Sequence, residues 1–208
     1  MQNNKLPAHS TELPEGYRQT ADFNLKHNTR AMIILNIAGF FLFLVAAALV
    51  QWYTRQVRSG QSGAAFSFQV DSLAQVGVFL VLLLLDIAIL VVLHEGLHGL
   101  SFWVITGKRP VFMIGPGYAA ASAPGEYIAK YPYLVTALCP LVVMTIAGLI
   151  AIPFVSPEVL LHVTAITVFN IGGAVGDLWV AAGLLTKRGP LMVKDELDRV
   201  IFFQPAEK

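Results

Sequence analysis

Four long apolar stretches dominate the sequence and restrict the folds that the chain can adopt. They cover residues 31–52, 73–106, 133–155 and 159–185. A helix needs about twenty apolar residues to cross roughly 30 Å of hydrocarbon, at about 1.5 Å per residue. The composition agrees, because 56% of the residues are hydrophobic and only 13% are charged, whereas soluble domains carry about 25% charged residues. The sequence therefore predicts an all-α membrane protein with four transmembrane helices.

The distribution of charge along the chain predicts an orientation and three regions. With these four spans, twelve Lys and Arg residues lie on one side of the membrane and two on the other. Because positively charged loops stay in the cytoplasm, we expect both termini to be cytoplasmic, with a prokaryotic plasma membrane as the location. The regions are a cytoplasmic N-terminal segment (1–30), a four-helix membrane domain (31–186) and a cytoplasmic tail (187–208).

The net charge argues against a nucleic-acid partner, and the cysteine content excludes internal disulfides and thiolate metal sites. The net charge is +1, so no surplus of positive charge is available to neutralise a nucleic-acid backbone, and we expect no nucleic-acid partner. Cys139 is the single cysteine, so the chain cannot form an internal disulfide or a thiolate metal site. Any metal ion must therefore be bound by histidines and carboxylates.

The second apolar stretch contains the pattern H-E-x-x-H at His94, Glu95 and His98. On a helix the two histidines lie about 40° apart, so both imidazoles reach one ion, and Glu95 lies about 100° from His94, where it can hold a water molecule. The alternative is a pair of core histidines bonded to neighbouring helices. Charged groups within a span cost roughly 2–3 kcal/mol or more each and persist mainly where they are functional. The pattern therefore favours half of a zinc site.

A hydrolytic zinc site needs a third protein ligand and an open fourth position. Asp177 lies about 14 Å from the cytoplasmic end of the fourth stretch, and the histidines lie about 12–18 Å from the same side. This equal depth favours Asp177, while Glu126 is the alternative because the loop after the second stretch can fold back. Asn170 lies about 20° from Asp177 around the helix, so its amide faces the same cavity or bonds across a helix interface.

Residues 110–122 predict a small β-hairpin or a re-entrant loop between the second and third stretches. Two short apolar runs flank the turn signal Gly115-Pro116-Gly117. An exposed edge strand there would align an extended peptide through main-chain hydrogen bonds. The alternative is a plain connecting loop.

Glycines and prolines predict how the helices pack. The fourth stretch has a surface of small residues, which we expect to pack against the second stretch and to bring Asp177 to the histidines. The third stretch contains two prolines, which we expect to kink it. These residues are Gly172, Gly173, Gly176 and Gly183 in the fourth stretch, and Pro140 and Pro153 in the third.

The chain resembles integral-membrane zinc metalloproteases of the site-2 protease type in two motifs. These are H-E-G-L-H-G-L in one span and N-I-G-G-A-V-G-D-L in a later one. The chain is also similar to a small membrane family of zincin-type peptidases of unknown function. The resemblance covers about residues 31–186 and implies that His94, His98 and Asp177 bind Zn²⁺. It also implies catalytic roles for Glu95 and Asn170, although no proline lies between Asn170 and Asp177 and Leu178 replaces the usual glycine.

Together these features predict a zinc-dependent intramembrane or juxtamembrane peptidase whose active site faces the cytoplasm. Zinc activates a water molecule, and Glu95 acts as the general base. The expected partners are the lipid bilayer and a membrane-protein or peptide substrate. The alternative is a non-catalytic zinc-binding scaffold or sensor, which Glu95 argues against because a structural site needs no base.

Overall fold

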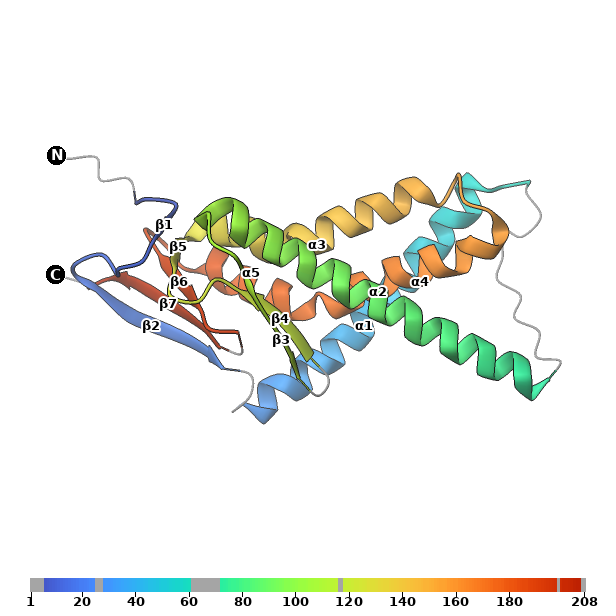
Figure 1. Cartoon of the computed structure of the whole chain (residues 1–208), viewed down its shortest axis with the longest axis horizontal. Helices are drawn as coiled ribbons and strands as arrows, with labels where there is room; N and C mark the ends of the chain where they lie inside the picture. The colour runs from blue at the N-terminus through green and yellow to red at the C-terminus, as the bar shows by residue number, and fades with distance from the viewer. Residues whose placement is uncertain (1–5, 25–27, 61–71, 116–117, 198, 207–208) are drawn as a thin grey trace. The chain divides into compact units, whose positions relative to one another are not determined.

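A computed structural model of the chain describes residues 6–24, 28–60, 72–115, 118–197 and 199–206. Three of the four apolar stretches form single helices, and the fourth is divided between two (Figure 1). The helices in the described residues are α1 (Thr29–Val57), α2 (Leu73–Thr106), α3 (Lys130–Ala151), α4 (Pro157–Gly173) and α5 (Val175–Thr186).

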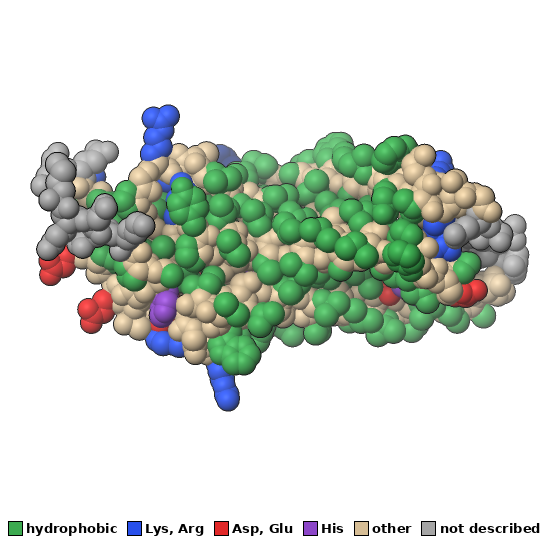
Figure 2. Space-filling model, turned by 90° about the horizontal axis from the view of Figure 1, so that it is seen from above, with side chains coloured by type: hydrophobic (Ala, Val, Ile, Leu, Met, Phe, Trp, Pro, Cys, Tyr) green, Lys and Arg blue, Asp and Glu red, His purple; other side chains and the backbone are tan. Residues whose placement is uncertain are grey.

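The helices are compatible with a membrane protein. α1, α2 and α3 are each long and apolar enough to cross a bilayer, and α4 with α5 would be a fourth span with a bend of 41°. Large apolar side chains are exposed along these helices, and Figure 2 shows few charged side chains among them. Leu84 in α2, for example, is 66% exposed. A contiguous apolar surface of this kind needs an apolar environment around it.

The expectation of an all-α fold is wrong for the two ends of the chain. They supply four strands of a five-stranded antiparallel sheet with the order β1-β5-β6-β7-β2. Its longest pairing runs from Tyr17 opposite Pro205 to Asn24 opposite Arg199. Such short segments give little strand signal until a distant partner completes the ladder. The strands are β1 (His9–Ser10), β2 (Tyr17–Asn24), β5 (Tyr127–Ala129), β6 (Met192–Asp195) and β7 (Arg199–Pro205).

A two-stranded antiparallel sheet lies between α2 and α3 in the sequence, as the sequence predicted. Strands β3 (Val111–Gly115) and β4 (Tyr118–Ser122) pair from Val111 opposite Ser122 to Gly115 opposite Tyr118. Residues 116 and 117 of the predicted turn lie outside the described residues.

The chain divides into two compact units. The first consists of Met1–Leu35, Glu95–Pro140 and Gly176–Lys208. Its core joins the five-stranded sheet to the end of α2, the start of α3 and α5. Gly183 of α5 faces the sheet, because a Cβ there would lie 2.9 Å from the ring of Phe23. The core residues include Phe102, Ile128, Tyr133, Leu184, Val193 and Phe202.

The second unit consists of Asn36–His94 and Leu141–Val175 and contains parts of α1 to α4. Gly172 of α4 packs on α1, because a Cβ there would lie 2.8 Å from Cβ of Phe43. Gly172 and Gly183 therefore face α1 and the sheet, and not α2 as expected. The core residues of this unit are Ala46, Val50, Ile152, Leu160 and Val168.

Candidate metal centre

His94 and His98 lie one turn apart on α2, which is uninterrupted from Leu73 to Thr106. The boundary between the two units falls between His94 and Glu95, but one continuous helix fixes the relative positions of these three residues. His98 is buried, whereas His94 and Glu95 are half-buried. The spacing of four residues places both imidazoles on one face of α2.

A proline in α3 determines which atom accepts a hydrogen bond from His98. Nδ1–H of His98 donates to the backbone carbonyl of Thr136 at 2.9 Å. In a regular helix this carbonyl would accept from the amide four residues later, but that residue is Pro140, which has no N–H. The hydrogen bond to the freed carbonyl selects the tautomer that leaves Nε2 of His98 available to a metal ion.

The role of Thr136 and Pro140 was missed in the sequence, where Pro140 was interpreted only as a kink. The signal was present, because a proline inside a helix always frees the carbonyl four residues before it. The sequence does not tell which donor uses that carbonyl, since His98 and Thr136 are 38 residues apart.

His94 is oriented by Asn170 of α4. Nδ1–H of His94 donates to Oδ1 of Asn170 at 3.0 Å. The amide nitrogen of Asn170 donates to the carbonyl of Leu141 at 3.4 Å and to Oγ1 of Thr145 at 3.3 Å. Asn170 is buried, so α3 holds its amide while the amide oxygen holds the imidazole. Nε2 of His94 is then the nitrogen available to a metal ion, as in His98.

Asp177 lies near the start of α5, just after a break in the fourth apolar stretch. α4 ends at Gly173 and α5 begins at Val175, with a bend of 41°. Asp177 lies in the first turn of α5, where the helix dipole stabilises a carboxylate. Its Oδ1 lies 3.3 Å from Nε2 of His98.

The three side chains form a group that could hold a metal ion. His94, His98 and Asp177 each offer a ligand atom, and these atoms lie within 4.8 Å of one another. Ligand atoms about 2.1 Å from a tetrahedral zinc ion lie roughly 3.4 Å apart, close to the 3.3 Å between His98 and Asp177. Two imidazoles and one carboxylate form a donor set typical of catalytic zinc, which keeps a fourth position for water. Within the described residues no other trio of His, Cys, Asp or Glu has this arrangement.

Glu126, the alternative third ligand, is bound elsewhere. It is fully buried between β4 and β5, where its carboxylate accepts from Nζ of Lys108 and lies 2.9 Å from Nδ1 of His9. Burial alone would raise the pKa of Glu126, but the hydrogen bonds from Lys108 and His9 outweigh it and hold that pKa below its ordinary value. The structure therefore places Asp177, and not Glu126, beside the histidines.

One comparison with known proteins matches the part of the chain that contains this group of side chains. Residues 87–189 match a family model described as "Putative zincin peptidase". No curated protein and no solved structure matches the chain. The matched segment contains both histidines, Glu95, Asn170 and Asp177. The match supports a zincin-like family and a metallopeptidase activity.

Proposed function

We propose that the protein is a zinc-dependent peptidase of the membrane that hydrolyses peptide bonds of membrane-associated substrates, similar in mechanism to site-2 proteases. Two observations carry the proposal together. The ligand atoms of His94, His98 and Asp177 lie close to one another, and Glu95 follows His94 directly on α2. A purely structural zinc site closes all four positions with protein ligands and has no use for a neighbouring carboxylate. This arrangement therefore favours catalysis over a scaffold.

Each residue has a separate role in this mechanism. Zinc bound by His94, His98 and Asp177 would polarise the scissile carbonyl and lower the pKa of a bound water to about 7. Glu95 takes the proton of the attacking water and delivers it to the leaving amine. Asn170 is a positioning residue that orients His94, because its amide oxygen accepts the hydrogen bond from that imidazole. This positioning role differs from the catalytic role that the resemblance to site-2 proteases implies for Asn170.

The hairpin β3–β4 offers a place for the substrate chain. Of the described strands, β3 pairs with β4 alone, and its residues Phe112 and Ile114 are 54% and 85% exposed. A free strand edge binds an extended peptide through main-chain hydrogen bonds. The peptide bonds of a membrane helix are already hydrogen-bonded, so the substrate must unwind locally to be bound in this way. The excess of Lys and Arg near both termini favours an active site toward the cytoplasm.

The test separates zinc binding from hydrolysis in the purified full-length chain. We expect the wild type to contain about one zinc ion per chain, measured by elemental analysis, and to cleave fluorescent casein or a model membrane-helix peptide. Glu95→Gln keeps the zinc and loses at least 10²-fold in cleavage rate, because the base is lost while the ligands remain. Glu15→Gln, at an exposed position, is the matched control and leaves both unchanged.

Two results would contradict the proposal in different ways. A chain that binds zinc but cleaves neither substrate would support the scaffold or sensor. Full cleavage by the Glu95→Gln variant would remove Glu95 from its role as base.

A further inference from the structure

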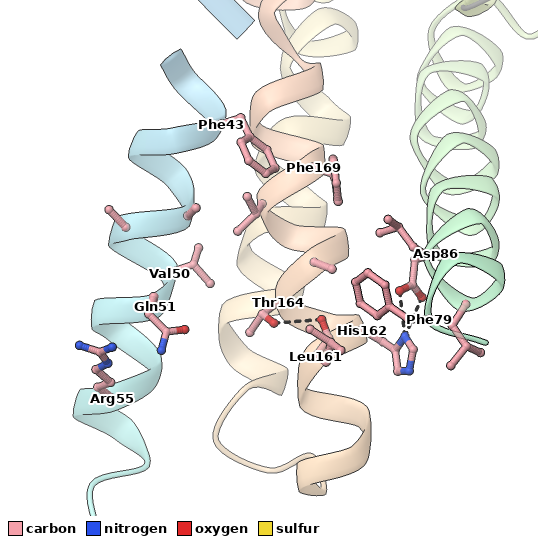
Figure 3. Close-up of a pocket in the computed structure, with 16 residues that line it drawn as sticks. Phe43, Val50, Gln51, Arg55, Phe79, Asp86, Leu161, His162, Thr164 and Phe169 are labelled. Carbon is pink, nitrogen blue, oxygen red and sulfur yellow. Dashed lines mark hydrogen bonds and ion pairs between the residues drawn. The ribbon is translucent and has the colours of Figure 1, made fainter. Parts of the chain in front are cut away.

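A cavity of about 680 Å³ lies within the second unit, between α1, α2 and α4. None of the candidate metal ligands lines it. Its walls are mainly apolar and include the rings of Phe43, Phe79 and Phe169 together with Leu82 and Val168 (Figure 3). Small-molecule sites typically have volumes of about 300–1,000 Å³ and apolar walls with a few polar groups. The cavity therefore has the size and lining of a ligand site.

One polar feature of the cavity is already satisfied within the protein. His162 of α4 donates from Nδ1 to both carboxylate oxygens of Asp86 of α2, at 2.8 and 3.0 Å. Asp86 is buried, so this pair ties α4 to α2 and leaves no free carboxylate in the cavity. Among the described residues, this pair also has no third ligating side chain of the kind that a metal site requires.

The other charged group of the cavity is Arg55 of α1. Arg55 lines the cavity, and its guanidinium makes no hydrogen bond or ion pair with any other described residue. Gln51 lies one turn before it on the same helix and also lines the cavity. Figure 3 shows Arg55 and Gln51 toward one end and Phe43 and Phe169 toward the other. The cavity thus has a cationic end and an aromatic end, about 18 Å apart along α1.

We propose that this cavity binds a long-chain carboxylate, with its carboxylate group at Arg55 and its alkyl chain along the aromatic wall. An arginine pairs with a carboxylate through two parallel hydrogen bonds, and Gln51 offers a further amide donor. The alkyl chain gains free energy from each methylene that it buries against the apolar wall. The site is independent of the metal centre, because no group proposed to bind zinc or substrate contributes to it.

The test uses palmitate and the purified full-length chain in an uncharged detergent, with binding measured by titration calorimetry and native mass spectrometry. We expect one palmitate per chain. Ala165→Phe and Ala48→Phe each fill the cavity and weaken palmitate binding at least tenfold. Ala38→Phe, on an exposed part of α1 away from the cavity, is the matched control with unchanged binding. Arg55→Gln weakens palmitate about tenfold and leaves hexadecanol, which has the same chain without the charge, unaffected.

Several outcomes would overturn the proposal. Unchanged palmitate binding in both filled variants, with melting temperatures like the wild type, would place the ligand elsewhere. If palmitate and hexadecanol bind with equal affinity, both to the wild type and to Arg55→Gln, then Arg55 does not recognise the carboxylate group. A diacyl phospholipid that remains bound through purification and that palmitate cannot displace would identify a lipid of the bilayer as the occupant instead.

Discussion

The described part of the chain contains two aspartate–histidine pairs that use helix α2, one in each unit. In the first, His98 donates from Nδ1 to the carbonyl of Thr136 and turns Nε2 toward Asp177 at 3.3 Å. In the second, His162 donates from Nδ1 directly to both oxygens of Asp86 at 2.8 and 3.0 Å. The residue types are the same, and the hydrogen-bond partner of Nδ1 differs.

The two pairs differ more in the ligands that lie beside the free ring nitrogen than in the partner of Nδ1. When a backbone carbonyl orients the imidazole, the other nitrogen and the carboxylate face each other with their lone pairs available to an ion. When the carboxylate itself accepts from Nδ1, it orients the imidazole and leaves Nε2 available, so a metal site there would need further ligands around Nε2. His94, oriented by Asn170 in the same way as His98, completes the first set. The second set has no such third member among the described residues.

The largest expected difference between the two pairs is in zinc binding. Asp177→Ala removes a ligand and should lower zinc affinity by more than about 100-fold, since even the loss of an orienting partner costs about 10–100-fold. Asp86→Ala is the matched variant in the other pair and should leave zinc affinity unchanged while lowering stability by about 1–3 kcal/mol. Competition with a fluorescent chelator and thermal unfolding measure the two quantities. A similar loss of zinc in both variants would end the distinction.

A smaller loss is expected when an orienting group is removed. Asn170→Ala leaves His94 in place but removes the acceptor for its Nδ1–H, so zinc affinity should fall about 10–100-fold. Thr164→Val is the control on the same helix, because the Thr164 hydroxyl, as far as the described residues show, donates to carbonyls of α4 alone. Chelator competition again provides the measurement. Unchanged affinity in Asn170→Ala would mean that other contacts orient His94.

Pro140→Ala should change zinc affinity and stability in opposite directions. The new N–H at position 140 competes with His98 for the carbonyl of Thr136, so zinc affinity should fall. We expect a loss of about tenfold, which is the lower limit of the range for the loss of an orienting partner. The metal-free chain should melt at a higher temperature, because proline in a helix interior costs roughly 3 kcal/mol. Pro153→Ala, after the end of α3, is the control. A rise in both quantities would show that the freed carbonyl has no part in zinc binding.

No effect on zinc affinity is expected at another buried acid, Asp195. Asp195 of β6 accepts from the hydroxyl of Tyr133 at 2.5 Å, and burial raises the pKa of Asp195 from 3.8 to about 6. The folded chain therefore holds this proton more tightly than the unfolded chain. Its contribution to stability is greatest below pH 4 and is lost as the pH rises to about 6, by at most about 3 kcal/mol.

Asp195→Asn should remove this dependence. The wild type should melt at a higher temperature at pH 4.5 than at pH 7, after other titrating groups are accounted for by comparison with the variant. The variant should show a smaller change across this range, with zinc affinity at pH 7 like the wild type. A pH dependence identical in the two chains would contradict the raised pKa.

The parts of the site that lie on one helix were predictable from the sequence. The positions of His94, Glu95 and His98 on one turn follow from helical periodicity, which is a local property. The apolar stretches likewise predicted the long helices, and short apolar runs around a glycine turn predicted β3 and β4. The depth argument favoured Asp177 because residues at equal distance from one membrane face can meet, but it left Glu126 open.

The remaining features depend on which distant segments pack together. Asn170 is 76 residues from His94 and Thr136 is 38 residues from His98, and no local rule pairs them. The sheet of the chain ends required β2 to meet β7, and the paired residues Asp22 and Arg199 of these strands are 177 residues apart. By itself the sequence determined the helices and the half-site on α2, because backbone periodicity and apolar length need only near neighbours. Only the tertiary structure decided which carboxylate lies beside the histidines and which groups orient them, because hydrogen bonds across helices depend on how the whole chain packs.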